Sequence, residues 1–372
     1  MPLAGDDLVP DSVRLSTEIA EISAFAESSE AGWTRRVYSD PYRASRQWVA
    51  EKMRSAGLET RIDSVGNIIG RLPGRDSSKP ALMTGSHTDT VQGGGRFDGV
   101  VGVLSGIEVA RRLRETGTQL ERDLYIVDFL GEEPNTFGIS CVGSRAMAGL
   151  LTPEHLDRID DEGRRLGDVM AAYGADPDKS LREGWKSGSL HAYIELHVEQ
   201  GPLLESIGYP IGVVTAIAGI ERLLVHFTGR PDHSGTMPMA NRHDALVAAA
   251  EAILTVERVG CGAPVHGVST TGRIESSPGA LNVVPGSARI WGELRSVDKQ
   301  WLSGAKKQVV EQIAADAEKR GVSTMVEWLN DQDPVPCSPT MQDRIAEAAD
   351  GLGYKWQAVP SGAGHDAAHM AH

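Results

Sequence analysis

The first half of the chain alternates between two hydrophobic patterns. Apolar residues at helical spacing predict helices within residues 16–57 and over residues 99–116. Short apolar runs and period-two alternation predict strands over residues 59–63, 66–72, 81–86, 124–130 and 193–198. Strand, helix and strand in that order predict an α/β domain, with a mostly parallel sheet and helices on both of its faces.

The second half has a different rhythm after Gly212. Strands are predicted over residues 221–228, 265–274, 287–297 and 323–329, and helices over residues 241–259 and 300–320. This β-α-β-β-α-β order is that of a ferredoxin-like α+β unit, which we expect to be a separate domain inserted into the first. The predicted domains are therefore residues 1–211 together with 331–372, and residues 212–330.

Charge and cysteine content argue against several classes of protein. The 372 residues include 51 acidic and 37 basic side chains, a net charge of −14 without a basic run, which argues against nucleic-acid binding. The three cysteines are far apart in sequence and odd in number, which argues against a disulfide framework and favours a reducing compartment. The first residues lack a signal-peptide pattern, and no apolar run approaches the ~18 residues of a membrane span. We therefore expect a cytoplasmic protein with no nucleic-acid or membrane partner.

Residues suited to metal binding follow the predicted strands of the first domain. His87 and Asp89 come after the strand at 81–86 and, being two apart, point to the same side of an extended segment. The imidazole can bind a metal ion, and the carboxylate can orient such a ligand. Asp98 ends a glycine-rich loop before the predicted helix at 99–116, and its two oxygens allow it to bridge two metal ions.

Acidic and imidazole side chains also follow the later strands. Glu132 and Glu133 leave the end of the strand at 124–130 in different directions, so one can bind a metal ion while the other acts as a general base towards water. In the next predicted strand, Glu195 and His197 share a face.

Each of these residues alone has a simpler explanation. Asp98 could cap the helix that follows it, and an isolated His–Asp or Glu–Glu pair is usually a solvated turn. Together, however, four successive element ends carrying His, Asp, Glu and His predict a metal centre. Imidazole mixed with carboxylate suits Zn, Mn, Co or Ni rather than Ca or a thiolate site, and no cysteine has ligand spacing.

The inserted domain has its own polar cluster. His233 lies in a Gly/Pro-rich loop, Asn282 lies in a turn, and Arg295 ends a predicted strand. A cation, an amide and an imidazole can together bind a carboxylate and polarise a carbonyl group. From spacing alone, these three residues could equally form hydrogen bonds that stabilise loops and bind no ligand.

Seven motifs stand in order along nearly the whole chain: GSHTDT at 85–90, GRFDG at 95–99, EEP at 132–134, ELHVEQGP at 195–202, HSGT at 233–236, NVVPG at 282–286 and SGAGHDA at 361–367. Together they resemble those of the hydantoinase/carbamoylase family of metal-dependent amidohydrolases, relatives of di-zinc aminopeptidases and carboxypeptidases. The resemblance implies a homodimer in which each subunit has a catalytic α/β domain and a smaller lid and dimerisation domain. It also implies two divalent metal ions per subunit, Zn or else Mn, Co or Ni.

The resemblance further implies a role for each matching residue. His87 and His197 would bind one metal ion and Glu133 the other, and Asp98 would bridge them. Glu132 would be the general base, supported by Asp89. Substrate would contact a further set of residues: Gln200, His233, Asn282, Arg295 and Gly364. Within that set, Arg295 and Asn282 would hold a carboxylate, and His233 would stabilise the oxyanion in its own or the partner subunit.

Members of this family cleave ureido or amide groups next to a carboxylate. The segment 133–145 is more similar to the branch that hydrolyses N-carbamoyl-L-amino acids to the amino acid, ammonia and CO₂. The alternatives are hydrolysis of allantoate, ureidoglycolate or β-ureidopropionate, and a dipeptidase or aminopeptidase activity. The family also has a later metal-binding histidine that none of His365, His369 and His372 matches. The resemblance therefore leaves the second metal site incomplete, and an inactive dimeric metal-binding scaffold is a further alternative.

Overall fold

The computed structural model of the chain describes residues 8–27, 32–264 and 266–372. The N-terminal residues considered for a signal peptide, and Val265 at the start of a predicted strand, lie outside these ranges. Contacts within the chain define two compact units. The first runs up to Pro210 and includes Ala348–Lys355 and His365–His372, and the second comprises Ile211–Glu347 and Trp356–Gly364.

The first unit is built on a five-stranded mixed sheet. The strands are β1 (Glu59–Ile62), β2 (Ile68–Leu72), β3 (Ala81–His87), β4 (Leu124–Phe129) and β5 (Leu190–Ile194). Their order is β1-β2-β4-β3-β5; β4, β3 and β5 are parallel, and β1 and β2 pair antiparallel. Because the parallel strands end at one edge, the residues that follow β3, β4 and β5 gather there.

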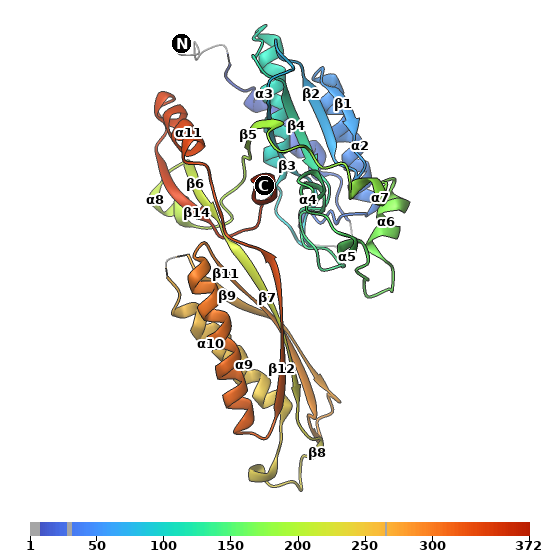
Figure 1. Ribbon diagram of the computed structural model, residues 1–372, viewed down its shortest axis with the longest axis vertical. Helices are drawn as coiled ribbons and strands as arrows, with labels where there is room; N and C mark the ends of the chain where they lie inside the picture. Colours follow the sequence, from blue (N-terminus) through green and yellow to red (C-terminus); the bar gives the residue numbers. More distant parts are fainter. Residues whose placement is uncertain (1–7, 28–31, 265) are drawn as a thin grey trace. The chain divides into compact units, whose positions relative to one another are not determined.

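Helices cover both faces of this sheet (Figure 1). On one face lie α1 (Ser12–Ser23), α2 (Asp40–Ser55) and α3 (Val100–Glu115), and on the other α4 (Val142–Met147) and α12 (Asp366–Met370). Within β4, Ile126 packs in the first core, whereas Val127 and Phe129 pack with Met147 in the second. This two-sided burial explains the nearly continuous apolar run of the strand. Shorter helices complete the unit: α5 (Pro153–Leu156), α6 (Leu166–Tyr173), α7 (Pro177–Ser180) and α8 (Leu203–Ile207).

The second unit contains the ferredoxin-like arrangement that the sequence predicts. The order of its antiparallel sheet is β12-β7-β11-β9, formed by β7 (Gly219–Thr228), β9 (Val268–Ser277), β11 (Ser287–Ser296) and β12 (Ser323–Gln332). Two helices, α9 (Ala245–Cys261) and α10 (Lys299–Glu318), pack against one face (Figure 1). Their alanines and valines, among them Ala249 and Val309, are fully buried against alternate strand residues such as Val225 and Ile290.

Smaller elements complete the second unit. A second sheet has the order β13-β6-β14, in which β6 (Ile211–Ile217) is parallel to β14 (Trp356–Ser361) and antiparallel to β13 (Val335–Pro336). A short pairing joins β8 (Asp232–His233) to β10 (Val283–Val284), and a 3₁₀ turn covers Met239–Asn241. In sequence, α11 (Pro339–Gly351) connects β13 to β14.

Two predicted elements differ in extent. Among the described residues of the range 16–57, α1 ends at Ser23 and α2 begins at Asp40, where the side chain of Ser39 caps the new helix. The strand predicted over 193–198 ends at Ile194, so the prediction that Glu195 and His197 share a strand face is wrong. The Glu195 carboxylate instead accepts the hydroxyl of Ser86 and the backbone N–H of Ala367, which holds the chain in an irregular path beyond the sheet. In the described ranges, no helix is long and apolar enough to span a membrane.

Candidate metal centre

His87 is the last residue of β3 and is almost completely buried. Its Nδ1 lies 3.0 Å from the backbone oxygen of Asp89 and 3.5 Å from the Oδ1 of the same residue. Because a carbonyl oxygen can only accept, Nδ1 carries the proton, and the neutral ring keeps a lone pair on Nε2. Burial by itself lowers the pKa of His87, but the charges of Glu132 and Asp89 outweigh it and raise the pKa well above its usual value. The surroundings of this imidazole therefore favour a cation.

Asp98 immediately precedes α3 but does not cap it. The N-cap is Gly99, which makes no side-chain cap bond, so the explanation of Asp98 as a helix cap is wrong. Gly99 has φ +64°, and a Cβ at this position would lie 2.5 Å from Nε2 of His87. Glycine is therefore required for α3 to begin this close to the imidazole.

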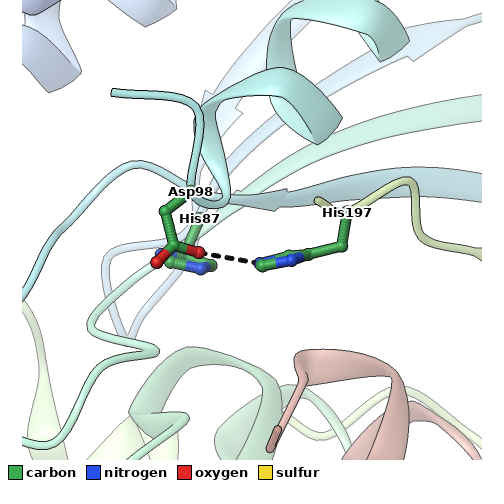
Figure 2. A group of neighbouring side chains, drawn as sticks. All are labelled: His87, Asp98 and His197. Atoms are coloured by element: carbon green, nitrogen blue, oxygen red, sulfur yellow. Dashed lines mark ion pairs between the residues drawn. The ribbon is translucent and has the colours of Figure 1, made fainter. Parts of the chain in front are cut away.

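His197 approaches the same point from the segment after β5. Its Nε2 lies 3.1 Å from Oδ1 of Asp98, and its Nδ1 lies 2.9 Å from the backbone oxygen of Val198. Figure 2 shows the His197 ring pointing towards the Asp98 carboxylate, beside His87. One ligand atom from each of His87, Asp98 and His197 lies within 4.8 Å of the other two. Within the described ranges, this is the group of side chains whose geometry suits a metal ion.

The donor set fits a divalent transition-metal ion. Since Nδ1 of both His87 and His197 faces a backbone carbonyl, both neutral rings offer Nε2, and Asp98 adds a carboxylate oxygen. Burial raises the pKa of Asp98, but its interactions with the His197 and His87 rings and with the Gln200 amide together outweigh burial and lower it, so the carboxylate stays ionised. The amide of Gln200, assigned to substrate by resemblance, donates to both Asp98 oxygens at 3.0 and 2.9 Å and orients them.

Asp89 links the metal-type ligands to the acid pair after β4. Its two carboxylate oxygens accept the backbone N–H groups of Glu132 and Glu133, each at 3.1 Å. Glu132 Oε2 lies 3.6 Å from Nε2 of His87. Burial raises the pKa of Glu132 well above its usual value and raises that of Glu133 to about 7. The buried carboxyl of Glu132 and the partly buried one of Glu133, both with high proton affinity, therefore follow β4, although Glu133 is not part of the group of three ligands.

Several residues that surround this centre were not among the predicted site residues. The ring of His365 lies 4.5 Å from that of His197, centroid to centroid. The next residue, Asp366, accepts the hydroxyl of Ser144 at 2.5 Å, and burial raises its pKa well above the usual value. Cys141, considered only as a metal ligand, donates through its thiol to Oε1 of Glu132 at 3.4 Å. The GHDA part of the last motif was the available signal for the first two of these residues.

The polar residues predicted in the inserted domain lie in the second unit. His233 is in β8, and its Nδ1 accepts the N–H of Gly235 at 3.0 Å, so the neutral ring carries its proton on Nε2. Arg295, near the end of β11, is paired with Glu293 at 2.7 Å and donates to the backbone oxygen of Gly362. Asn282 precedes β10 and is exposed, and Gly364, partly buried, lies close to Ile220.

Comparison with known proteins shows which family the chain belongs to. The sequence model of one family, described as Peptidase family M20/M25/M40, matches residues 83–372 of the chain. This family is metal-dependent. The chain is 37% identical over 359 residues to an N-carbamoyl-L-amino-acid amidohydrolase of Paenarthrobacter aurescens, covering 96% of this chain and 87% of that protein. It is 38% identical over 373 residues to a ureidoglycolate hydrolase of Arabidopsis thaliana, covering 97% and 78%.

A solved structure agrees with the sequence matches. The crystal structure of an amidase of the hydantoinase/carbamoylase family from Burkholderia vietnamiensis superposes with a TM-score of 0.89 at 32% identity, covering 99% of this chain and 88% of that one. The named relatives are hydrolases of C–N bonds in small ureido acids, as the resemblance in the sequence implied. Two imidazoles and a carboxylate converge at the sheet edge, and the chain belongs to peptidase family M20/M25/M40, within which it is similar to hydantoinase/carbamoylase amidases.

Proposed function

We propose that this protein hydrolyses the carbamoyl C–N bond of an N-carbamoyl-L-amino acid, releasing the amino acid, ammonia and CO₂. The observation that carries the proposal is the convergence of His87, Asp98 and His197 within 4.8 Å, with the buried carboxyl of Glu132 at 3.6 Å from His87. Three relatives that are 35 to 37% identical over 96% of this chain are N-carbamoyl-L-amino acid amidohydrolases, which supports this substrate class. Ureidoglycolate hydrolases that are 36 to 38% identical over 97% of the chain make ureidoglycolate the second candidate substrate.

Two divalent ions, Zn or else Mn, Co or Ni, belong to this proposal. His87 and His197 would hold one ion and Glu133 the other, with the Asp98 carboxylate between them. When bound, the ions polarise the carbamoyl oxygen and lower the pKa of water at the site. The Gln200 amide keeps the Asp98 carboxylate oriented for this task.

Glu132 acts as the general base and then as the general acid. It takes a proton from the water that attacks the carbamoyl carbon, and it passes that proton to the leaving nitrogen. A buried carboxyl with a raised pKa suits both steps, because it can hold the proton between them. Asp89 supports the base by fixing its backbone through the hydrogen bond to the Glu132 N–H.

The first unit is the catalytic domain in this proposal, and the second unit provides the lid and the homodimer contact. Arg295 and Asn282 bind the substrate carboxylate, and Gln200 and Gly364 lie along the substrate. The Nε2–H of His233 donates to the oxyanion, in its own or the partner subunit, which the acceptor role of its Nδ1 supports. The ion pair with Glu293 fixes the guanidinium of Arg295 before substrate binds.

Substitution of the base is the direct test. Glu132→Gln keeps the shape of the side chain but cannot take a proton, so kcat should fall on the order of 10²–10⁴-fold. Metal content, measured by elemental analysis, should stay unchanged. Glu257→Gln, on the exposed face of α9, is the control. Near-normal turnover of Glu132→Gln with metal bound contradicts the mechanism.

A substrate panel separates the proposal from its alternatives. After loading with Zn, Mn, Co or Ni, ammonia release is measured from N-carbamoyl-L-amino acids, β-ureidopropionate, allantoate and ureidoglycolate, and amine release from dipeptides. The proposal predicts the highest kcat/KM for carbamoyl amino acids. Arg295→Ala should raise KM for these acids more than it lowers kcat. Metal binding without turnover of any panel member indicates the inactive scaffold.

A further inference from the structure

Cys141 lies against the carboxyl of Glu132 in the first unit. The thiol is buried, with 2% of the residue exposed, and Sγ donates to Oε1 at 3.4 Å. The backbone N–H of Cys141 also donates to the backbone oxygen of Glu132 at 2.8 Å. Cys141 has φ +55°, a left-handed conformation uncommon for a residue with a Cβ. Two hydrogen bonds to one glutamate therefore accompany a strained backbone at this position.

The two oxygens of Glu132 have different neighbours. Oε2 lies 3.6 Å from Nε2 of His87, on the side of the candidate metal centre, whereas Oε1 accepts the thiol. Asp89 fixes only the backbone of Glu132, through the N–H. The thiol of Cys141 holds Oε1 on the side opposite the His87 contact, so the two neighbours together set the direction of the carboxyl plane.

We propose that Cys141 is a positioning residue for Glu132: its S–H bond holds Oε1 and thereby presents Oε2 to the reacting water. This inference rests on the proposed function of Glu132 as the base.

If Cys141 has only a packing role, the activities of its Ala and Ser variants should rank in the opposite order. If Cys141 only filled space, Cys141→Ala would be tolerated, and Cys141→Ser would be worse because it buries a hydroxyl. If Cys141 positions Glu132, Cys141→Ser keeps a donor and retains much of the turnover, whereas Cys141→Ala loses it. The left-handed backbone is the same in all three proteins, so its strain does not affect the comparison.

The experiment measures kcat, KM and metal content for Cys141→Ala and Cys141→Ser in the metal-loaded enzyme, with Cys261→Ala at an exposed cysteine as control. We expect Cys141→Ala to lower kcat about 10- to 100-fold at unchanged KM and metal content, because a small displacement of a reacting group has effects of this size. Cys141→Ser should lie within a few-fold of the native enzyme. Native kcat in Cys141→Ala, or a larger loss in Cys141→Ser, overturns the inference.

A second measurement does not depend on activity. The infrared S–H stretching band of Cys141, isolated by difference against Cys141→Ser, should move to higher frequency in Glu132→Ala, where the acceptor is gone. An unmoved band shows that the thiol does not donate to Glu132 and also overturns the inference. Glu132→Gln separates the two claims: if it keeps turnover, the proposed function fails, and if it is inactive while Cys141→Ala is normal, only the role of Cys141 fails.

Discussion

The carboxylate of Asp89 accepts the backbone N–H of Glu132 at 3.1 Å. Its second oxygen accepts the N–H of Glu133 at the same distance, and its backbone oxygen faces Nδ1 of His87. One buried residue after β3 thus holds both the imidazole at the end of that strand and the acid pair that follows β4.

Asp89→Asn should disturb two of these contacts, those of the side chain with the backbone N–H groups of Glu132 and Glu133. An amide has one acceptor oxygen, so its NH₂ group would face one of the two N–H donors and leave that donor unpaired. Loss of a hydrogen-bond partner that orients metal-binding residues typically lowers metal affinity or activity 10- to 100-fold, and we expect a loss of this size here. Chelator competition and steady-state kinetics measure it. Asp343→Asn, an exposed position in α11, serves as control, and equal behaviour of the two variants would refute this role of Asp89.

Gly99→Ala should weaken metal binding through a direct clash. The added Cβ would lie 2.5 Å from Nε2 of His87, on a backbone with φ +64°. Gly117→Ala is a matched control, because its φ is +66° and a Cβ there would meet nothing within 4 Å. Both variants carry the backbone cost of about 1 kcal/mol, but only Gly99→Ala should also lose metal affinity, about tenfold or more. Equal zinc affinities in the two variants would argue against the assigned ligand position.

Removal of metal should lower the stability of the first unit. A cation held by His87, Asp98 and His197 binds the folded chain in preference to the unfolded one, which stabilises it by about 2.7 kcal/mol at a concentration 100 times its Kd. Zn²⁺ added to chelator-treated protein should therefore raise Tm, as followed by scanning calorimetry. His87→Ala and His197→Ala should abolish the increase. An increase of native size in either variant would mean that the ion binds elsewhere.

Stability should depend on pH through His369. Burial, assisted by the charge of Arg145, lowers the pKa of His369 to about 3, and its Nε2 has no hydrogen-bond partner in the described part of the chain. Between pH 6.5, the ordinary value for histidine, and pH 3, the unfolded chain binds a proton that the folded chain does not. Stability is therefore complete above pH 6.5 and falls as the pH decreases through this range.

Between pH 7 and pH 5 the expected loss is about 2 kcal/mol. His369→Leu removes the titrating group, so its free energy of unfolding should fall less over this interval, as measured by denaturant titration in the presence of chelator. Parallel pH dependences in the native protein and His369→Leu would show that the buried imidazole does not contribute.

The sequence by itself determined the elements and the chemistry of the candidate ligands. Periodicity identified β3, β4 and α3 to within a residue or two, because each pattern reflects burial of one face of a local element. Polar residues at the ends of parallel strands indicated where a site would form, since those ends share one edge of the sheet. The ferredoxin-like order of the second unit also followed from local patterns alone.

Only the tertiary structure decided which of these residues meet. His197 reaches Asp98 from irregular backbone beyond β5, whereas local alternation predicted a longer strand. The left-handed turn at Gly99 likewise depends on the close approach of the His87 ring, which comes from the end of β3. Local hydrophobic patterns record which side of an element is buried, but the direction of a side chain in a loop is set by hydrogen bonds to residues far away in the sequence, which no local pattern encodes.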